Sequence, residues 1–216
     1  MTPPRPRADS PQPVRYEQIL EAARTAIEEY GPGALSGQIA ERAGLARPNV
    51  YRYFSTKDEL DRALARSIHS ELRAAMQAHL DLPGTPIDVI HTLVAAQVKW
   101  ADRHPNLYRF LVSAGYQRRS PQRTVQRSDF AAEINEFAAH YIPRLADDPD
   151  AAEATFVGLI GLFDASVLRW LNQPVGTREQ LIDRLTAQAW LILDHHLREI
   201  GIQVDPAVAN MPPAGR

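Results

Sequence analysis

The sequence predicts an all-α fold of about nine helices, with a helix-turn-helix near the N-terminus and a larger helical region after it. Three observations support this fold class. Apolar residues recur at spacings of three and four along most of the 216 residues, as one face of a helix requires. Glycine or proline closes most of these runs, and no run alternates apolar and polar residues as a strand does.

Residues 34–60 carry the helix-turn-helix pattern. Ile39, Ala40 and Ala43 share one helical face, and Gly44 follows where a helix end favours a left-handed residue without a Cβ. The first helix of the pair is therefore expected to end near Ala43.

The second helix of the pair is expected from Arg47 to Phe54. Pro48 suits its first turn, because proline presets φ and lacks an N–H that would have no helical partner there. Val50 and Phe54 stand four residues apart and form the buried side, so the polar side chains around them face outward.

The same stretch is basic, although the formal net charge of the chain is −2. Between Glu41 and Asp58 the only charges belong to three arginines and Lys57, so a polyanion can dock here. The spacing of Thr56 and Glu59 matches a capping box, which predicts the start of a third helix whose N-terminus can face a phosphate.

These positions resemble the N-terminal domain of TetR-type (TetR/AcrR) transcriptional regulators. The resemblance covers roughly residues 14–62 and rests on a spaced set of positions rather than on one motif. The matching positions are Arg15, Ile19, Leu20, Ala22, Ala23, Gly31, Ile39, Ala40, Ala43, Gly44, Tyr51, Phe54, Lys57 and Leu60. In two places the chain departs from the family pattern: Leu35 and Ser36 reverse its usual hydroxyl-then-aliphatic order, and Ala46 replaces its usual serine or threonine.

The resemblance implies a ligand-responsive regulator, a repressor that binds a palindromic operator in double-stranded DNA as a homodimer. A small hydrophobic effector would release it. The expected DNA-binding residues are Ser36, Arg47, Pro48, Asn49, Tyr51, Arg52, Tyr53 and Lys57. By the family pattern, the two tyrosines and Lys57 contact phosphates, and Arg47, Asn49 and Arg52 reach base edges or adjacent backbone.

The domain organisation follows from the order of these segments. Residues 1–13 contain five prolines and form an expected disordered arm. We expect the DNA-binding domain over residues 14–60, a ligand-binding and dimerisation domain over 61–205, and a disordered tail over 206–216. Helices are predicted at 14–30, 56–80, 85–103, 106–114, 130–141, 150–171 and 177–200, with an arginine-rich loop at 117–127.

The last two predicted helices are apolar on more than one side, so a second subunit or the rest of their own domain must cover them. Family members pair these helices in a four-helix bundle, whereas the alternative is one large intramolecular core. The expected interface residues are Phe156, Ile160, Val167, Trp170, Trp190, Leu193 and Leu197.

Large apolar residues from several helices, together with two polar ones, predict an effector pocket between helices. The expected pocket residues are Gln97, Trp100, Tyr108, Leu111, Phe130, Ile134, Phe137, Phe163 and Asp164. The same apolar residues are equally typical of a solid core.

Enzymatic and metal-dependent functions find little support. The chain has no cysteine, so thiolate catalysis and Cys-ligated zinc are excluded. His195 and His196 are adjacent on a helix and cannot chelate one ion together. No nucleophile, base and orienting group form a recognisable set. We therefore expect no catalytic residue, metal or cofactor, and no enzyme.

A membrane or secreted location is also disfavoured. The N-terminus lacks the apolar segment of a secretory signal. Residues 156–171 are interrupted by Asp164 and Arg169 and are predicted to be too short and too polar to span a bilayer. The expectation is a cytoplasmic protein, and the competing interpretation is a helical small-molecule-binding protein that acts without DNA.

Overall fold

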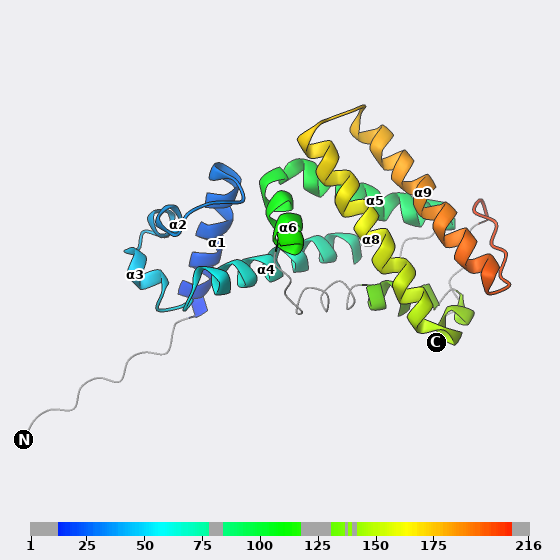
Figure 1. Ribbon diagram of the computed structural model, residues 1–216, viewed down its shortest axis with the longest axis horizontal. Coiled ribbons are helices and arrows are strands. Elements are labelled where there is room, and N and C mark those ends of the chain that lie inside the picture. The colour runs from blue at the N-terminus through cyan, green and yellow to red at the C-terminus, as the bar shows by residue number, and fades with distance from the viewer. Residues whose placement is uncertain (1–12, 78–83, 118–130, 137, 140–141, 209–216) are drawn as a thin grey trace, which may run out of the picture. The chain divides into compact units, whose positions relative to one another are not determined.

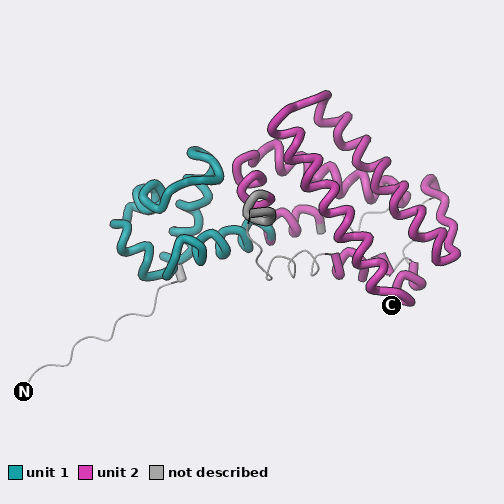
Figure 2. The backbone as a smooth tube through the Cα atoms, in the orientation of Figure 1, with its two compact units in different colours: residues 1–69 teal, residues 70–216 magenta. Residues whose placement is uncertain are grey.

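The computed structural model describes residues 13–77, 84–117, 131–136, 138–139 and 142–208. The chain divides into two compact units, Met1–His69 and Ser70–Arg216, drawn in teal and magenta in Figure 2. The regular elements of the described residues are helices, shown in chain order in Figure 1. The predicted all-α fold class is confirmed.

Unit 1 is a three-helix domain followed by the start of a longer helix. Its elements are α1 (Pro13–Tyr30), α2 (Ser36–Arg42), α3 (Arg47–Val50) and α4 (Lys57–Gln77), the last of which continues into unit 2. The first helix ends where the sequence predicts, because Gly31 adopts a φ of +87° and its N–H donates to the carbonyl of Ile27 at 2.8 Å. α2 contacts both α1 and α3.

Apolar side chains from all four helices form the core of unit 1. The largest fully buried ones are Ile19, Ile27, Ile39, Val50, Phe54, Leu60, Leu64 and Ile68. The ring centroids of Phe54 and Tyr16 lie 4.7 Å apart, which joins the segment after α3 to α1. The positions on this core are those that helical periodicity places on one face.

The recognition helix is shorter than predicted, because α3 ends at Val50 and residues 51–53 form a turn. The N–H of Arg52 donates to the carbonyl of Asn49 at 3.3 Å, and that of Tyr53 donates to Val50 at 3.1 Å. Each of these bonds joins residues three positions apart, so the turn is wound more tightly than an α-helix, whose bonds join residues four apart. Periodicity does not distinguish this turn from a helix, since Val50 and Phe54 lie on the same side in both.

α5 (Pro86–Arg103) is the central helix of unit 2. It contacts α6 (Pro105–Gln117), α8 (Pro149–Asn172) and α9 (Arg178–Glu199), and α8 also contacts α6, α9 and the 3-10 helix η1 (Pro143–Asp147). α8 and α9 lie side by side in Figure 1. Of the helix expected at 130–141, residues 131–136 and 138–139 are helical, whereas Phe130, Phe137 and Tyr141 lie outside the described residues.

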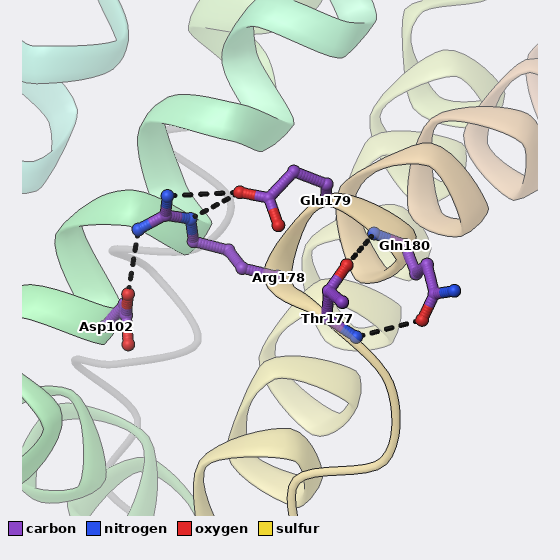
Figure 3. A network of polar contacts seen from close by, with 5 residues as sticks. All are labelled: Asp102, Thr177, Arg178, Glu179 and Gln180. Carbon is purple, nitrogen blue, oxygen red and sulfur yellow. Dashed lines mark hydrogen bonds and ion pairs between the residues drawn. The ribbon is translucent and has the colours of Figure 1, made fainter.

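Two helices of unit 2 start with the caps that the sequence predicts. Thr85 caps α5, and its hydroxyl accepts from the N–H of Asp88 at 3.2 Å. The Thr177–Gln180 capping box of α9 is complete, with bonds of 3.1 and 2.9 Å (Figure 3). Beside this box, the guanidinium of Arg178 lies 3.0 Å from the carboxylate of Asp102 and joins the start of α9 to the end of α5.

The capping box predicted at the start of α4 is only half right. The N–H of Glu59 donates to the hydroxyl of Thr56 at 3.0 Å, as expected. The carboxylate of Glu59 accepts from the N–H of Ser55 at 2.7 Å instead of reaching back to that of Thr56. The chain bends at Ser55 and Thr56 before α4 begins, and the N–H of Ser55 lies within reach of the Glu59 carboxylate.

The prediction that residues 156–171 are too short and too polar to span a bilayer is wrong for the helix that contains them. α8 begins at Pro149 and has 24 residues, so it is long and apolar enough to cross a membrane by those two measures alone. Of the 18 consecutive residues that form the most apolar part of α8, only 22% are buried within the chain. Length therefore does not decide against a membrane span, and a core helix of a soluble protein passes the same test.

Candidate nucleic-acid interface

A tight turn of residues 43–46 joins α2 to α3. Gly44 has a φ of +62°, where a side chain would be strained, and its N–H donates to the carbonyl of Glu41 at 3.0 Å. The N–H of Leu45 donates to the carbonyl of Ala40 at 2.9 Å. These two bonds close the end of α2 and set the direction in which α3 leaves it.

α3 has a buried side and an exposed side. Val50 and Phe54 are each 1% exposed, whereas Arg47, Asn49 and Arg52 are exposed. Pro48 is exposed in the first turn, as predicted, and no side chain caps the helix at Ala46. The apolar pair holds α3 against the core and leaves the polar side chains facing solvent.

Ser36, Arg47 and Tyr51 meet at one end of this exposed side. The hydroxyl oxygens of Ser36 and Tyr51 are 2.9 Å apart and share a hydrogen bond. The guanidinium of Arg47 lies 5.9 Å from the ring centroid of Tyr51. The bonds to Ser36 and then to Arg47 lower the pKa of the Tyr51 hydroxyl below its usual value. This hydroxyl is therefore held in place and close to positive charge.

Lys57 occupies the first turn of α4, close enough that its charge also acts on Tyr51. Its ammonium nitrogen lies 2.5 Å from a carboxylate oxygen of Asp61, one helical turn later. Sequence reasoning missed Asp61, although its spacing of four from Lys57 is the signal that indicates such a pair. Tyr53, the remaining predicted contact, is half-buried in the turn after α3.

In unit 2, four of the predicted pocket residues come together. The amide of Gln97 on α5 donates to the hydroxyl of Tyr108 on α6 at 2.9 Å, and that hydroxyl donates to Asp164 on α8 at 3.1 Å. The ring centroids of Trp100 and Tyr108 lie 6.5 Å apart, and the indole N–H of Trp100 donates to Glu71 at 3.0 Å. Glu71 on α4 is a residue that sequence reasoning missed.

The other predicted pocket residues are all apolar. Leu111, Ile134 and Phe163 are half-buried, and the latter two pack against the apolar cluster around Phe156 and Leu159. Phe130 and Phe137 lie outside the described residues. No group of three His, Asp or Glu side chains able to hold a metal occurs in the part of the chain that the structure describes.

The predicted interface residues fall into two groups. Phe156, Val167 and Leu197 are buried within the single chain, whereas the others are half-buried: Ile160, Trp170, Trp190 and Leu193. On α9, Leu191 and Ile192 are 68% and 41% exposed, and neither was predicted at the interface. The most exposed large apolar residues of α9 in the single chain are therefore not the ones predicted at the interface.

A basic helix-turn-helix, packed on the core by its apolar side and with its polar side exposed, has the arrangement of a DNA-binding domain. Residues 19–64 match the family model described as "Bacterial regulatory proteins, tetR family". This N-terminal domain belongs to the TetR family, and the resemblance found in the sequence is confirmed.

Individual relatives agree with this assignment. Over 70 residues, which are 32% of this chain and 36% of the relative, the chain is 39% identical to the HTH-type transcriptional repressor LfrR of Mycolicibacterium smegmatis. A TetR-family regulator from Streptomyces coelicolor aligns with a TM-score of 0.66 at 20% identity, covering 87% of this chain and 85% of that one. FadR from Bacillus subtilis, solved in complex with stearoyl-CoA, aligns with a TM-score of 0.60 at 15% identity, covering 81% and 97%.

At these identities the two structures establish a common fold and no more. The relatives found by sequence are named HTH-type transcriptional regulators or repressors, in agreement with the prediction that this chain is not an enzyme.

Proposed function

We propose that the chain is a cytoplasmic, ligand-responsive repressor that binds a palindromic operator as a homodimer. The exposed polar side of α3 carries this proposal. Arg47 and Asn49 are exposed there and Arg52 is exposed in the turn that follows, while Val50 and Phe54 pack α3 and this turn against the core. Arginine and asparagine are the side chains that pair with guanine and adenine edges in the major groove.

The proposed phosphate contacts surround these base contacts. Tyr51, Tyr53 and Lys57 lie in the turn after α3 and at the start of α4. An ammonium and two phenol hydroxyls are suitable donors to phosphate oxygens, and such contacts fix the orientation of the recognition helix on the duplex. Ser36 acts in this scheme through its bond to Tyr51.

Homodimer formation is supported by the small size of α3 and by the apolar surface of unit 2. One four-residue helix contacts few bases, whereas two copies related by a two-fold axis contact half-sites in successive major grooves. Three of the predicted interface residues are buried in the single chain. The two subunits therefore contact each other, in this proposal, through the exposed Leu191 and Ile192. The half-buried Trp170 and Trp190 complete this contact.

The dimer is tested with Leu191→Asp, which places a charge on the proposed interface but in solvent in a single chain. Light scattering on the wild type should give twice the 24.1 kDa of one chain, and the variant should give about half the wild-type mass. Val208→Asp, at another exposed apolar residue, is the control and should remain dimeric. A dimeric Leu191→Asp protein would place the interface elsewhere.

The proposed effector is a mostly hydrophobic molecule bound in unit 2. The hydrogen-bonded Gln97, Tyr108 and Asp164 come from α5, α6 and α8 and can orient a polar group of a ligand. The repressor LfrR and the FadR complex with stearoyl-CoA support a repressor with an acyl or lipophilic effector. Release from DNA requires that the effector prefer the DNA-incompetent state by about 1–3 kcal/mol.

Selection from random duplexes followed by a mobility-shift titration tests DNA binding. The selected site should be two-fold symmetric, and Lys57→Ala should weaken binding to all sequences and reduce its salt dependence. Absence of any selected sequence would overturn the proposal. Thermal-shift screening with lipophilic compounds and acyl thioesters then identifies ligands. A ligand that stabilises the protein but leaves the DNA complex intact at saturation is not its inducer.

A further inference from the structure

Asp61 is the one carboxylate among the buried polar residues that the structure describes, with 8% of its surface exposed. Burying a carboxylate is costly unless charge and hydrogen bonds compensate. The ammonium nitrogen of Lys57 lies 2.5 Å from a carboxylate oxygen of Asp61. Counting side-chain atoms alone, Lys57 is 28% exposed and Asp61 is 12% exposed. The ion pair therefore joins a residue in the core of unit 1 to one at its surface.

The stability of α4 does not explain why this pair is present. A cation in the first turn of a helix opposes the helix dipole, and a lysine that precedes its acidic partner by four residues is in the less favourable order. Lys57 stands in that first turn and in that order. Its position is therefore better explained by a role in binding than by a role in folding.

We infer that Asp61 is a positioning residue for DNA recognition, holding the ammonium of Lys57 at one place beside α3. The inference rests on the proposed function, in which Lys57 contacts a phosphate. Lysine has a flexible four-carbon stem, so an unpaired ammonium follows any phosphate within its reach. When Asp61 fixes the ammonium, it donates to a phosphate oxygen at one position, and this contact sets the register of the recognition helix over the bases.

The chemistry of lysine permits both contacts together. An ammonium has three N–H donors, so one bond to Asp61 leaves two for a phosphate oxygen. Lys57 is one of only two lysines among the 24 basic residues of the chain, and the other, Lys99, is exposed on α5. The cost of the arrangement is a carboxylate close to DNA, which weakens binding to every sequence. The gain is discrimination between sequences.

A double-mutant cycle tests the inference on the full-length protein. Asp61→Asn and Asp58→Asn each remove one negative charge from the first turns of α4, but Asp58 is exposed. Asp61→Asn should lower the ratio of operator to random-DNA affinity by about threefold or more, and Asp58→Asn should change it by less than about twofold. In the Lys57→Ala background the two substitutions should become equivalent. An equal effect of both in the wild-type background, or a persistent difference without Lys57, would overturn the inference.

If Asp61→Asn does not fold, Asp61→Glu carries the same cycle, because it keeps the charge and displaces the carboxylate. Lysine-selective ¹⁵N labelling provides a measurement that needs no DNA, since only Lys57 and Lys99 give side-chain signals. The Lys57 ammonium should be protected from solvent exchange and Lys99 should not, and Asp61→Asn should remove the difference. A wild-type protein that binds no DNA contradicts the proposed function, whereas DNA binding with no coupling between Asp61 and Lys57 contradicts only this inference.

Discussion

The two units use their polar side chains differently. In unit 1 the polar pairs are close in sequence: Lys57 and Asp61 are four residues apart, and Ser36 and Tyr51 are 15 apart. In unit 2 the capping pairs of α5 and α9 are also local, but other pairs join distant helices: Tyr108 and Asp164 are 56 positions apart, and Asp102 and Arg178 are 76 positions apart. The DNA-binding unit is thus built from local patterns, and the family match at residues 19–64 lies within it. Unit 2 depends on long-range contacts that local patterns do not reveal.

The largest effect is expected from emptying the core of unit 1. Phe54→Ala removes a ring that is 1% exposed and packs on Tyr16, at an expected cost of about 3–5 kcal/mol. Hydrogen exchange followed by mass spectrometry should show loss of protection in residues 13–69 and retained protection in α5, α8 and α9. Tyr30→Ala, at a half-exposed ring, is the control. Equal loss of protection in both units would mean that they unfold together.

The hydrogen bonds that join Gln97, Tyr108 and Asp164 in unit 2 are tested by Tyr108→Phe. The substitution removes one hydroxyl and leaves Gln97 and Asp164 without their shared partner, which should cost about 1–3 kcal/mol. All three tryptophans lie in unit 2, so urea unfolding followed by their fluorescence reports on this unit alone. Tyr30→Phe in unit 1 should leave that transition unchanged. A Tyr108→Phe protein as stable as the wild type would mean that solvent replaces the hydroxyl.

The recognition helix is tested by Asn49→Ala, which removes an exposed side chain without affecting the core. Base preference should flatten at one position of each half-site, by about 1–3 kcal/mol of discrimination, while binding to random DNA changes little. Quantitative selection with variant and wild type measures the preference at each position. Unchanged preference would show that Asn49 does not contact a base.

The smallest effect is expected at the cap of α5. Bonds from the backbone and hydroxyl of Thr85 lower the pKa of Asp88, so its contribution to stability is complete above the unfolded pKa and is lost as the pH falls through the folded value. The stability difference between wild type and Asp88→Asn should therefore shrink below about pH 4. Asp150→Asn in the first turn of α8 is the control for a helix-dipole effect. Thermal unfolding across this pH range distinguishes the two, and a constant difference would assign no role to the carboxylate charge.

The sequence by itself determined the features that short stretches encode. The helix ends at Gly31 and Gly44, the caps at Thr85 and Thr177 and the buried pair Val50 and Phe54 all follow from residue type and spacing, because these interactions span four or five residues. The resemblance to TetR regulators depends on the same local positions. The Lys57–Asp61 pair has this spacing too, but most such pairs are solvated, and only its burial distinguishes it.

Only the tertiary structure decided which helix faces which. Periodicity gives the apolar side of each helix but not its neighbour, so the meeting of Gln97, Tyr108 and Asp164 could not be predicted. The same limit explains the interface residues. Phe156, Leu191, Ile192 and Leu197 are all apolar in the sequence, yet α5, α8 and α9 pack so that Phe156 and Leu197 are buried and Leu191 and Ile192 are exposed.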